Sequence, residues 1–241
     1  MIAVGTCGFP RSRTEVFRKV HAVEIQETFY GHLEPATARK LRESAPDSFI
    51  FTVKASQLIT HEPTSPTYRR SNIRPEGAAA RNYGSFKPTR EVMAGWRKTE
   101  EVCKIIGAKA VVFQSPPSFH QTDENAVNVD RFFSKTRIDI LRAWEPRGRW
   151  DTEVLKEICE RNDLIHCIDP FGAEPVTSGP AYFRLHGKPP GGRMYYYSYS
   201  DADLARVESI CRRHEECFVM FNNISMLSDA IRFMGRLNVQ E

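Results

Sequence analysis

Eight short strand-like runs recur along the chain and constrain its fold more than any other feature. Each run is rich in β-branched or aromatic residues, as strands are. The runs are Ile2–Cys7, His21–Gln26, Phe49–Ala55, Ala110–Gln114, Arg137–Glu145, Leu164–Asp169, Ala181–Gly187 and Cys217–Asn223. Helical patterns lie between them, and strands that alternate with helices predict a parallel sheet.

Helical periodicity and capping signals mark five further segments. They are Glu34–Ala45, Thr89–Ile106 with Gly107 as its C-cap, a helix opening at Asp151, one opening with a Ser200–Asp203 capping box, and Met226–Leu237. The first and sixth connections have the weakest helical patterns. Eight strand–helix repeats favour a single (β/α)8 TIM-like barrel over residues 1–241. An open doubly wound sheet is the alternative, although no GxGxxG supports its dinucleotide-binding form.

The composition is that of an ordinary globular domain. The chain has 241 residues, of which 41% are hydrophobic and 27% charged. No apolar run approaches the roughly 20 residues that span a bilayer. The amino terminus reads as a strand rather than a signal peptide, so we expect a cytoplasmic protein without membrane contact. The six cysteines form no CxxC pair and read as small buried hydrophobes.

Polar residues occur at the carboxyl ends of seven of the predicted strands. They are Glu24, Gln26, Lys54, Gln114, Glu145, Asp169, Arg184, His186 and Asn222. In a barrel, inward-facing residues at these ends line the mouth, whereas outward-facing residues pack under helices. Charges removed from water are costly unless they are paired, so such a cluster indicates a functional pocket. The net charge of +4 permits an anionic ligand there.

Seven motifs resemble, in order, those of the Domain of Unknown Function 72 family, the YecE-like proteins. They are GTCGF, VEIQETFY, FTVKA, ITH, VFQSPPSF, YFRLHG and FVMFNN, and they extend from Gly5 to about Asn223. The resemblance implies a TIM barrel related to the xylose-isomerase-like group, which also includes endonuclease IV-type enzymes. It implies no particular activity.

The resemblance also implies which positions are typical of the family. These are Glu24, Lys54, His61, Gln114, Arg184, His186, Asn222 and Asn223. In the family, the fifth strand usually reads like EFRH followed by a tryptophan. Here the run is WEPRGRW, so Glu145, Arg147 and Trp150 fill the Glu, Arg and Trp positions, and Pro146 stands where the aromatic residue would be. This departure leaves the direction of Arg147 open. Gln26 stands where an asparagine is common.

These positions receive two sets of expected roles. Glu24, Glu145, His186, Lys54 and His61 are candidate catalytic residues, and Gln26, Gln114, Arg147, Arg184, Asn222 and Asn223 are candidate ligand-binding residues. The carboxylates and His186 would supply acid/base chemistry or hold a divalent metal. Lys54, Arg147 and Arg184 would hold an anion, so Arg184→Ala should weaken binding without changing thermal stability much.

Each candidate also has a purely structural interpretation. Glu24 and Glu145 would each form a salt bridge with Arg184 or Lys54, and His186 would be a hydrogen-bonded barrel histidine. Asn222 and Asn223 would cap the end of a strand. Asp169, which precedes Pro170, would cap a turn, and His61 would be either a lid residue or a turn residue.

A long insertion, residues 56–88, follows the third strand. Its cationic and aromatic residues are Tyr68, Arg69, Arg70, Arg74, Arg81, Tyr83 and Lys87. Loops of this length are usually lids or partner surfaces, and interleaved Arg and Tyr suit a phosphate or a nucleic acid. The alternative is a solvated loop whose cations balance nearby acids.

Two classes of function remain. The first is an enzyme that acts on a phosphorylated sugar or a nucleic-acid sugar-phosphate, of the sugar-phosphate isomerase or phosphodiester hydrolase kind. The second is a non-catalytic module that binds an anion or a nucleic acid in the same pocket. Loss of turnover in a folded Glu145→Gln variant would favour the enzyme.

Overall fold

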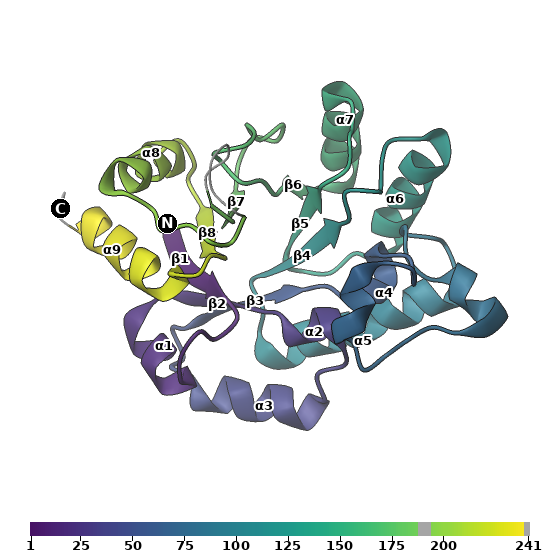
Figure 1. Ribbon diagram of the computed structural model, residues 1–241, viewed down its shortest axis with the longest axis horizontal. Coiled ribbons are helices and arrows are strands. Elements are labelled where there is room, and N and C mark those ends of the chain that lie inside the picture. The colour runs from purple at the N-terminus through teal and green to yellow at the C-terminus, as the bar shows by residue number, and fades with distance from the viewer. Residues whose placement is uncertain (188–193, 239–241) are drawn as a thin grey trace. The chain divides into compact units, whose positions relative to one another are not determined.

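The computed structural model describes residues 1–187 and 194–238, and within this part of the chain the eight predicted strands are all present. The strands are β1 Ile2–Cys7, β2 Ala22–Ile25, β3 Ile50–Lys54, β4 Ala110–Ser115, β5 Leu141–Pro146, β6 Ile165–His166, β7 Ala181–Leu185 and β8 Cys217–Phe221. They follow the order β6-β5-β4-β3-β2-β1-β8-β7 in one sheet (Figure 1). A parallel bridge from Ile168 to Phe183 joins the segment after β6 to β7. This is the strand order of a (β/α)8 barrel.

Helices occupy most of the connections. The α-helices are α1 Arg13–Lys19, α2 Glu27–Tyr30, α3 Pro35–Ser44, α4 Gln57–Thr60, α5 Arg90–Ile106, α6 Asp123–Lys135, α7 Thr152–Asn162, α8 Asp201–Cys211 and α9 Met226–Asn238. Two 3₁₀ helices, η1 Pro66–Arg70 and η2 Gly77–Asn82, lie in the long insertion. The sixth connection, residues 167–180, contains no helix. The Lys-Pro-Pro-Gly-Gly stretch at residues 188–192, whose composition predicts a loop, lies outside the described residues.

The predicted capping signals are confirmed. Thr89 caps the start of α5, and Gly107 ends it in the left-handed conformation with φ of 65°. Asp151 accepts hydrogen bonds from the backbone at the start of α7. Ser200 and Asp203 form the expected reciprocal capping box of α8. These local signals depend on neighbouring residues only, which is why the sequence reveals them.

Two predictions of secondary structure were incomplete. No helical pattern was predicted between β4 and β5, where α6 begins after Thr122, whose side chain caps it. The fifth strand was predicted from Arg137 but begins at Leu141. Because α6 continues to Lys135 and its C-cap is Thr136, the residues that follow are needed to bring the chain from the helix to the strand.

The chain divides into two compact units. The first consists of Met1–Glu24, Ala45–Phe51 and His166–Glu241, and the second of Ile25–Ser44 and Thr52–Ile165. In the first unit β1 pairs in parallel with β8, and β8 with β7. Helix α9 packs against β1, β8 and α8 (Figure 1). Phe17, Phe49 and Phe51 form an edge-to-face aromatic cluster within this unit.

The second unit is built on β3, β4 and β5, which pair in parallel. Helix α5 packs against α3 and α4, and α6 packs against α7. An aromatic core fills this unit, and its members are Phe86, Trp96, Phe113, Phe119, Phe132, Phe133, Trp144 and Trp150. Most of these rings come from β4, β5, α5 and α6, but Phe86 comes from the insertion.

The insertion is anchored at its far end by Phe86. This fully buried ring lies 5.4 to 6.4 Å from five aromatic neighbours, measured between ring centroids. Gly84, Ser85 and Phe86 all have positive φ, which is uncommon for a non-glycine residue. Their backbone amides donate to carbonyl oxygens of Leu58, Thr60 and Ile59. Aromatic packing and backbone pairing therefore offset the strain of this turn.

All six cysteines are free thiols and buried, as predicted. Burial raises the pKa of Cys103 and of Cys159 to about 12 each, so both stay protonated at neutral pH. In residues 1–187 and 194–238, no helix is long and apolar enough to span a membrane.

Candidate functional site

The carboxyl ends of β3, β4 and β5 carry a continuous chain of polar side chains, all in the second unit. The Lys54 ammonium donates to Oε1 of Gln114 at 2.9 Å, and Nε2 of Gln114 donates to Oε2 of Glu145 at 2.9 Å. Nε of Arg147 donates to Oε1 of the same carboxylate at 2.8 Å. We refer to Lys54, Gln114, Glu145 and Arg147 as the polar relay.

Strand geometry explains how the polar relay forms. Gln114 and Glu145 are direct partners in the parallel ladder of β4 and β5, so their side chains leave the sheet side by side. Lys54 is the last residue of β3 and pairs with Val112, two residues before Gln114. Residues two apart on a strand share a face. The three side chains therefore leave the sheet on the same face and contact one another in sequence.

The direction of Arg147, which the sequence left open, is toward Glu145. The side chain of Glu145 is 7% exposed and that of Arg147 is 20% exposed. Pro146, in the position where the family usually has an aromatic residue, is the last residue of β5. The ion pair therefore links the end of the strand to the residue that follows it, with the guanidinium partly open to solvent.

An aromatic ring supports the other end of the polar relay. The ammonium nitrogen of Lys54 lies 3.8 Å from the centroid of the Phe29 ring, a cation–π distance. Phe29 is buried in α2, within the ETFY motif that follows β2. Its position under Lys54 was not predicted, because an aromatic residue in this motif looks like ordinary core. Lys54 itself is 5% exposed.

His61 lies beside the polar relay and is uncharged at neutral pH. Burial, together with the positive charges of Lys54 and Arg147, lowers the pKa of His61 to about 3. Its Nδ1 is 2.8 Å from the Thr60 hydroxyl, and its ring meets that of Phe29 edge-on at 5.1 Å. A neutral imidazole can accept or donate a hydrogen bond, but it cannot act as an imidazolium acid here.

Glu24 in β2 forms a fully buried ion pair with Arg184 in β7, in the first unit. Nη2 of Arg184 donates to Oε1 of Glu24 at 2.8 Å, and Nε donates to Oε2 at 3.0 Å. The Tyr182 hydroxyl donates to Oε2 at 2.9 Å. Both charged side chains are 0% exposed. This is the salt-bridged arrangement that the structural interpretation of Glu24 proposed, and it directs Arg184 to a protein carboxylate.

His186 and Asp169 form a second contact in the first unit. Oδ2 of Asp169 accepts from the backbone N–H of His186 at 2.9 Å and lies 3.6 Å from Nδ1 of its ring. Oδ1 of Asp169 accepts from the backbone N–H of Phe171, so the carboxylate also caps a turn. Asp169 therefore both shapes the loop after β6 and faces the imidazole.

The remaining candidates differ in how their side chains are used. Nδ2 of Asn223 donates to Tyr197 O at 2.6 Å and to Asp229 Oδ2 at 2.7 Å, which fits a structural cap better than a ligand contact. Asn222 is half-buried, and its backbone N–H continues the ladder to Leu185 O. Gln26 is half-buried and precedes α2.

The arrangement of donors does not fit a divalent metal. Both oxygens of Glu24 and both oxygens of Glu145 accept hydrogen bonds from cationic or amide side chains. Within residues 1–187 and 194–238, no three His, Cys, Asp or Glu side chains lie together as a metal site requires. We therefore derive no chemical step through a metal.

The candidates thus fall into one group in each unit. Glu24, Arg184, His186, Asn222 and Asn223 belong to the first unit, and Gln26, Lys54, His61, Gln114, Glu145 and Arg147 to the second. Their convergence on one pocket stays a prediction.

Comparison with solved structures shows the same fold in several proteins. A DUF72 family protein of Enterococcus faecalis has a TM-score of 0.75 at 17% identity, covering 99% of this chain and 98% of that one. A xylose isomerase domain containing protein of Salmonella typhimurium scores 0.58 at 13% identity, covering 96% and 93%. Endonuclease IV of Thermus thermophilus scores 0.53 at 14% identity, covering 99% and 98%.

A search of curated protein sequences found no match. The family model described as "Protein of unknown function DUF72" matches residues 14–240, which is nearly the whole chain. The chain therefore belongs to the DUF72 family and has the TIM-barrel fold that the sequence predicted.

Proposed function

We propose that the protein is an enzyme that acts on a phosphorylated sugar, or on the sugar-phosphate of a nucleic acid, by acid/base chemistry at the carboxyl ends of the strands. The observation that carries this proposal is the polar relay, in which two cations flank an amide and a carboxylate through contacts of 2.8 to 2.9 Å. Four polar residues at or just after the ends of three strands are joined by hydrogen bonds and are buried or half-buried, which is typical of a site rather than of a surface.

The two cations of the polar relay are suited to bind the phosphate. Lys54 and Arg147 both lower the pKa of His61, so the fields of both reach the same imidazole. Arg147 carries a permanent charge on a planar guanidinium, and its Nε donates to Glu145. A phosphate that approaches this cluster would be attracted by both charges.

Glu145 is the group to which we assign proton transfer. The Gln114 amide and the Arg147 guanidinium orient its carboxylate, so the direction from which it can take a proton is defined. His61, being neutral, would hydrogen-bond a substrate hydroxyl.

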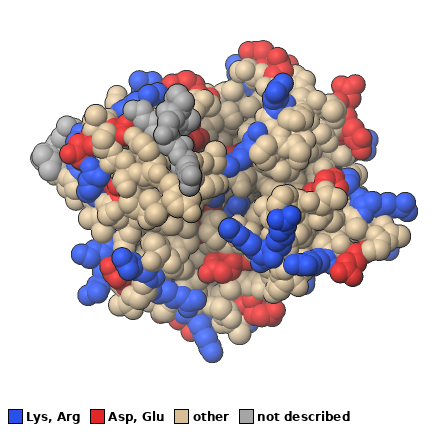
Figure 2. Space-filling model, in the orientation of Figure 1, with Lys and Arg blue, Asp and Glu red and all other residues tan. Residues whose placement is uncertain are grey.

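The fold neighbours support both substrate classes in the proposal. One is named as a xylose isomerase domain containing protein and another as endonuclease IV. The charge distribution supports the smaller substrate, because Figure 2 shows acidic and basic side chains mixed over the visible face. An extended nucleic-acid interface would need a basic patch or stripe.

The test separates binding from turnover. Purified protein is titrated with ribose 5-phosphate and with inorganic phosphate by isothermal calorimetry. Turnover is assayed on phosphorylated aldoses, for isomerisation, and on a phosphodiester, for hydrolysis. We expect Lys54→Met and Arg147→Met each to weaken phosphate binding about tenfold or more, since each removes a charge-assisted contact. Lys104→Met, on the exposed side of α5, is the matched control.

The Glu145→Gln variant distinguishes the enzyme from the binding module. We expect it to fold, to bind ribose 5-phosphate and to lose turnover by roughly 10² to 10⁴, the usual contribution of a general acid or base. Phosphate binding without turnover in the unmodified protein would instead support the non-catalytic anion-binding module. Binding that is unchanged in both cation variants would refute the assigned site altogether.

A further inference from the structure

His61 carries a ring nitrogen that the fold leaves without a partner. The residue is 4% exposed, and its Nδ1 lies 2.8 Å from the Thr60 hydroxyl. Within residues 1–187 and 194–238, Nε2 has no hydrogen-bond partner, and it is not one of the unpartnered side-chain atoms that the protein encloses. Nε2 is therefore reachable, although the rest of the side chain is buried. A ring placed in this way is suited to meet a ligand.

The Thr60 hydroxyl determines which nitrogen of the ring carries the proton. Thr60 is 1% exposed, so its hydroxyl proton needs an acceptor within the protein. Among the residues that the structure describes, Nδ1 of His61 is the acceptor that this hydroxyl meets. The hydroxyl therefore donates to Nδ1, and the proton of the neutral ring lies on Nε2. His61 thus presents an N–H donor at its accessible nitrogen.

The surroundings of His61 keep the ring neutral. Burial and the positive charges of Lys54 and Arg147 lower its pKa to about 3. Lys54 and His61 also share a neighbour, because the ammonium lies 3.8 Å and the imidazole 5.1 Å from the centroid of the Phe29 ring. The Nε2 donor therefore belongs to the cationic surroundings of the polar relay, where a phosphate would bind.

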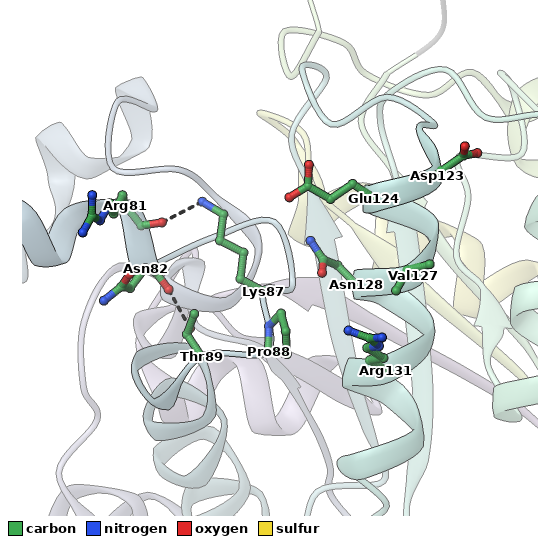
Figure 3. Close-up of a pocket in the computed structure, with 10 residues that line it drawn as sticks. All are labelled: Arg81, Asn82, Lys87, Pro88, Thr89, Asp123, Glu124, Val127, Asn128 and Arg131. Carbon is green, nitrogen blue, oxygen red and sulfur yellow. Dashed lines mark hydrogen bonds between the residues drawn. The ribbon is translucent and has the colours of Figure 1, made fainter.

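The end of the long insertion holds His61 in place. His61 is the C-cap of α4, and backbone N–H groups of residues 84–86 donate to carbonyl oxygens of residues 58–60 in this helix. The stretch that follows is fastened to η2, where Lys87 and the Thr89 hydroxyl each donate to a carbonyl oxygen (Figure 3). A donor on a fixed support needs no reorganisation when it meets developing charge.

We propose that the protein is an aldose–ketose isomerase for sugar phosphates, in which Nε2–H of His61 donates to the carbonyl oxygen of the open-chain substrate. This inference rests on the proposed function, in which Lys54 and Arg147 bind the phosphate and Glu145 transfers a proton, and it names the reaction. A neutral imidazole is able to polarise a carbonyl. Hydrolysis of a phosphodiester would need an acid for the departing alkoxide, which a neutral ring supplies poorly.

The reaction balances without a further reactant. Glu145 takes the proton from C2, the electron pair of that C–H bond becomes the C1=C2 double bond, and the carbonyl π pair moves to O1. The Nε2 proton of His61 passes to O1, and the ring takes the O2 proton in its place. Glu145 then returns its proton to C1 as the C2=O bond forms. One aldose becomes one ketose, and both side chains regain their starting state.

Ring nitrogen chemical shifts of the isotope-labelled full chain test the tautomer directly. The His61 signals are assigned by their loss in His61→Asn. We expect Nε2 to be protonated and Nδ1 unprotonated from pH 7 to pH 5, and Thr60→Val to weaken this preference because it removes the hydroxyl that donates to Nδ1. A proton on Nδ1 in the unmodified protein would overturn the proposal, whatever the activity.

Turnover is followed in deuterated water with ribose 5-phosphate, arabinose 5-phosphate and glucose 6-phosphate. We expect a ketose with solvent deuterium at C1, because the carboxyl proton of Glu145 exchanges with water. His61→Phe keeps a ring against Phe29 but has no donor, so kcat should fall by about 10² to 10³ while phosphate binding changes less than about twofold. Lys104→Met, on the exposed side of α5, is the control and should keep full turnover.

The outcomes separate this inference from the proposed function. Full kcat in His61→Phe, or no ketose from any of the three aldoses, would overturn the isomerase. Phosphodiester hydrolysis without aldose conversion would do the same and leave the proposed function standing. Phosphate binding that is unchanged in Lys54→Met would refute the proposed site itself. If His61→Phe does not fold, the ring nitrogen shifts of the unmodified protein still decide the matter.

Discussion

Two glutamates that the sequence treats alike have different surroundings. Both oxygens of Glu24 are occupied by Arg184 and Tyr182, and the carboxylate has no exposure. Glu145 is held by an amide and by a guanidinium that is partly open to solvent. Strand parity predicts on which face a carboxylate lies, but it does not predict its partner. The partner is what separates a structural glutamate from a candidate base.

The buried Glu24–Arg184 pair leads to a prediction about stability. Removing one partner of such a pair leaves an uncompensated buried charge, so Arg184→Ala should lower the free energy of unfolding by about 3–5 kcal/mol. This replaces the expectation, drawn from the sequence, that the substitution leaves stability nearly unchanged. Urea denaturation followed by circular dichroism measures the change.

A double variant provides the control for this pair. Glu24→Leu with Arg184→Met removes both charges and keeps apolar volume, so it should be more stable than Arg184→Ala. The free energy of unfolding of Arg184→Ala could instead lie within about 1 kcal/mol of the value for the unmodified protein, which is the range expected for an exposed ion pair. That result would show that the guanidinium is not paired as described.

The buried His61 predicts how stability depends on pH. Its pKa is about 3 in the folded protein and near 6.5 when unfolded. At a pH between these two pKa values, His61 is protonated in the unfolded chain but not in the folded protein. Protonation therefore favours the unfolded chain, and His61 lowers the free energy of unfolding as the pH falls below 6.5. The slope approaches about 1.4 kcal/mol per pH unit at most.

A substitution at His61 isolates this contribution. Asparagine can replace Nδ1 as a hydrogen-bonding partner for Thr60, but it does not titrate. We expect the free energy of unfolding of His61→Asn, relative to the unmodified protein, to improve steadily from pH 7 to pH 4. A difference that stays constant over this range in urea titrations would show that His61 is not held in its neutral form.

At the scale of elements, the long insertion is tied down by a residue that sequence reasoning did not select. The Phe86 ring is buried among aromatic residues of β4, β5 and α6, and its backbone has positive φ. In the sequence it looks like one apolar residue in a polar loop. Its role depends on contacts far along the chain, which local patterns do not contain.

Phe86→Ala should therefore destabilise the protein strongly. Removal of a fully buried phenylalanine costs about 3–5 kcal/mol through lost transfer energy and the cavity left behind. Tyr83→Ala in the same insertion is the comparison: Tyr83 is half-buried, so a smaller loss is expected. Chemical denaturation of both variants measures the difference, and equal losses would mean that Phe86 does not anchor the loop.

Capping residues and strand runs were predictable, whereas helix α6 and the start of β5 were not. Thr89, Asp151 and Ser200 begin helices as expected, because a cap is formed by residues within one turn. The start of β5 was misplaced because residues 137–140 have strand-like composition but lie between α6 and the sheet. Tertiary position decided the boundary there, against local propensity.

At the scale of the whole molecule, repetition was the strongest signal. Eight strand runs separated by helices predicted the (β/α)8 fold, and the strand order agrees with it. The candidate site was predictable as a set of residue types at strand ends. The polar relay, its support by Phe29 and the pairing of Glu24 with Arg184 were not, because they depend on distances between side chains of different strands.

The mixed surface charge leads to a last prediction, on salt dependence. If a nucleic acid binds through its phosphates at Lys54 and Arg147 only, about two contacts form. The logarithm of the association constant should then fall with the logarithm of salt concentration with a slope of about −1.4, at 0.7 per single-strand contact. Six to ten contacts across a basic surface would give a slope several times steeper. The net charge of +4 and the interspersed acids of Figure 2 favour the shallow slope.

Fluorescence anisotropy of a labelled single-stranded oligonucleotide, titrated at several salt concentrations, measures this slope. Ribose 5-phosphate should displace the oligonucleotide, because both would place a phosphate on the same two cations. Lys54→Met should make the slope shallower by about 0.7, the contribution of one single-strand phosphate contact. Lys104→Met should leave the slope unchanged. A steep slope that neither substitution alters, with no displacement by ribose 5-phosphate, would place nucleic-acid binding elsewhere on the molecule and leave the polar relay to a small phosphorylated substrate.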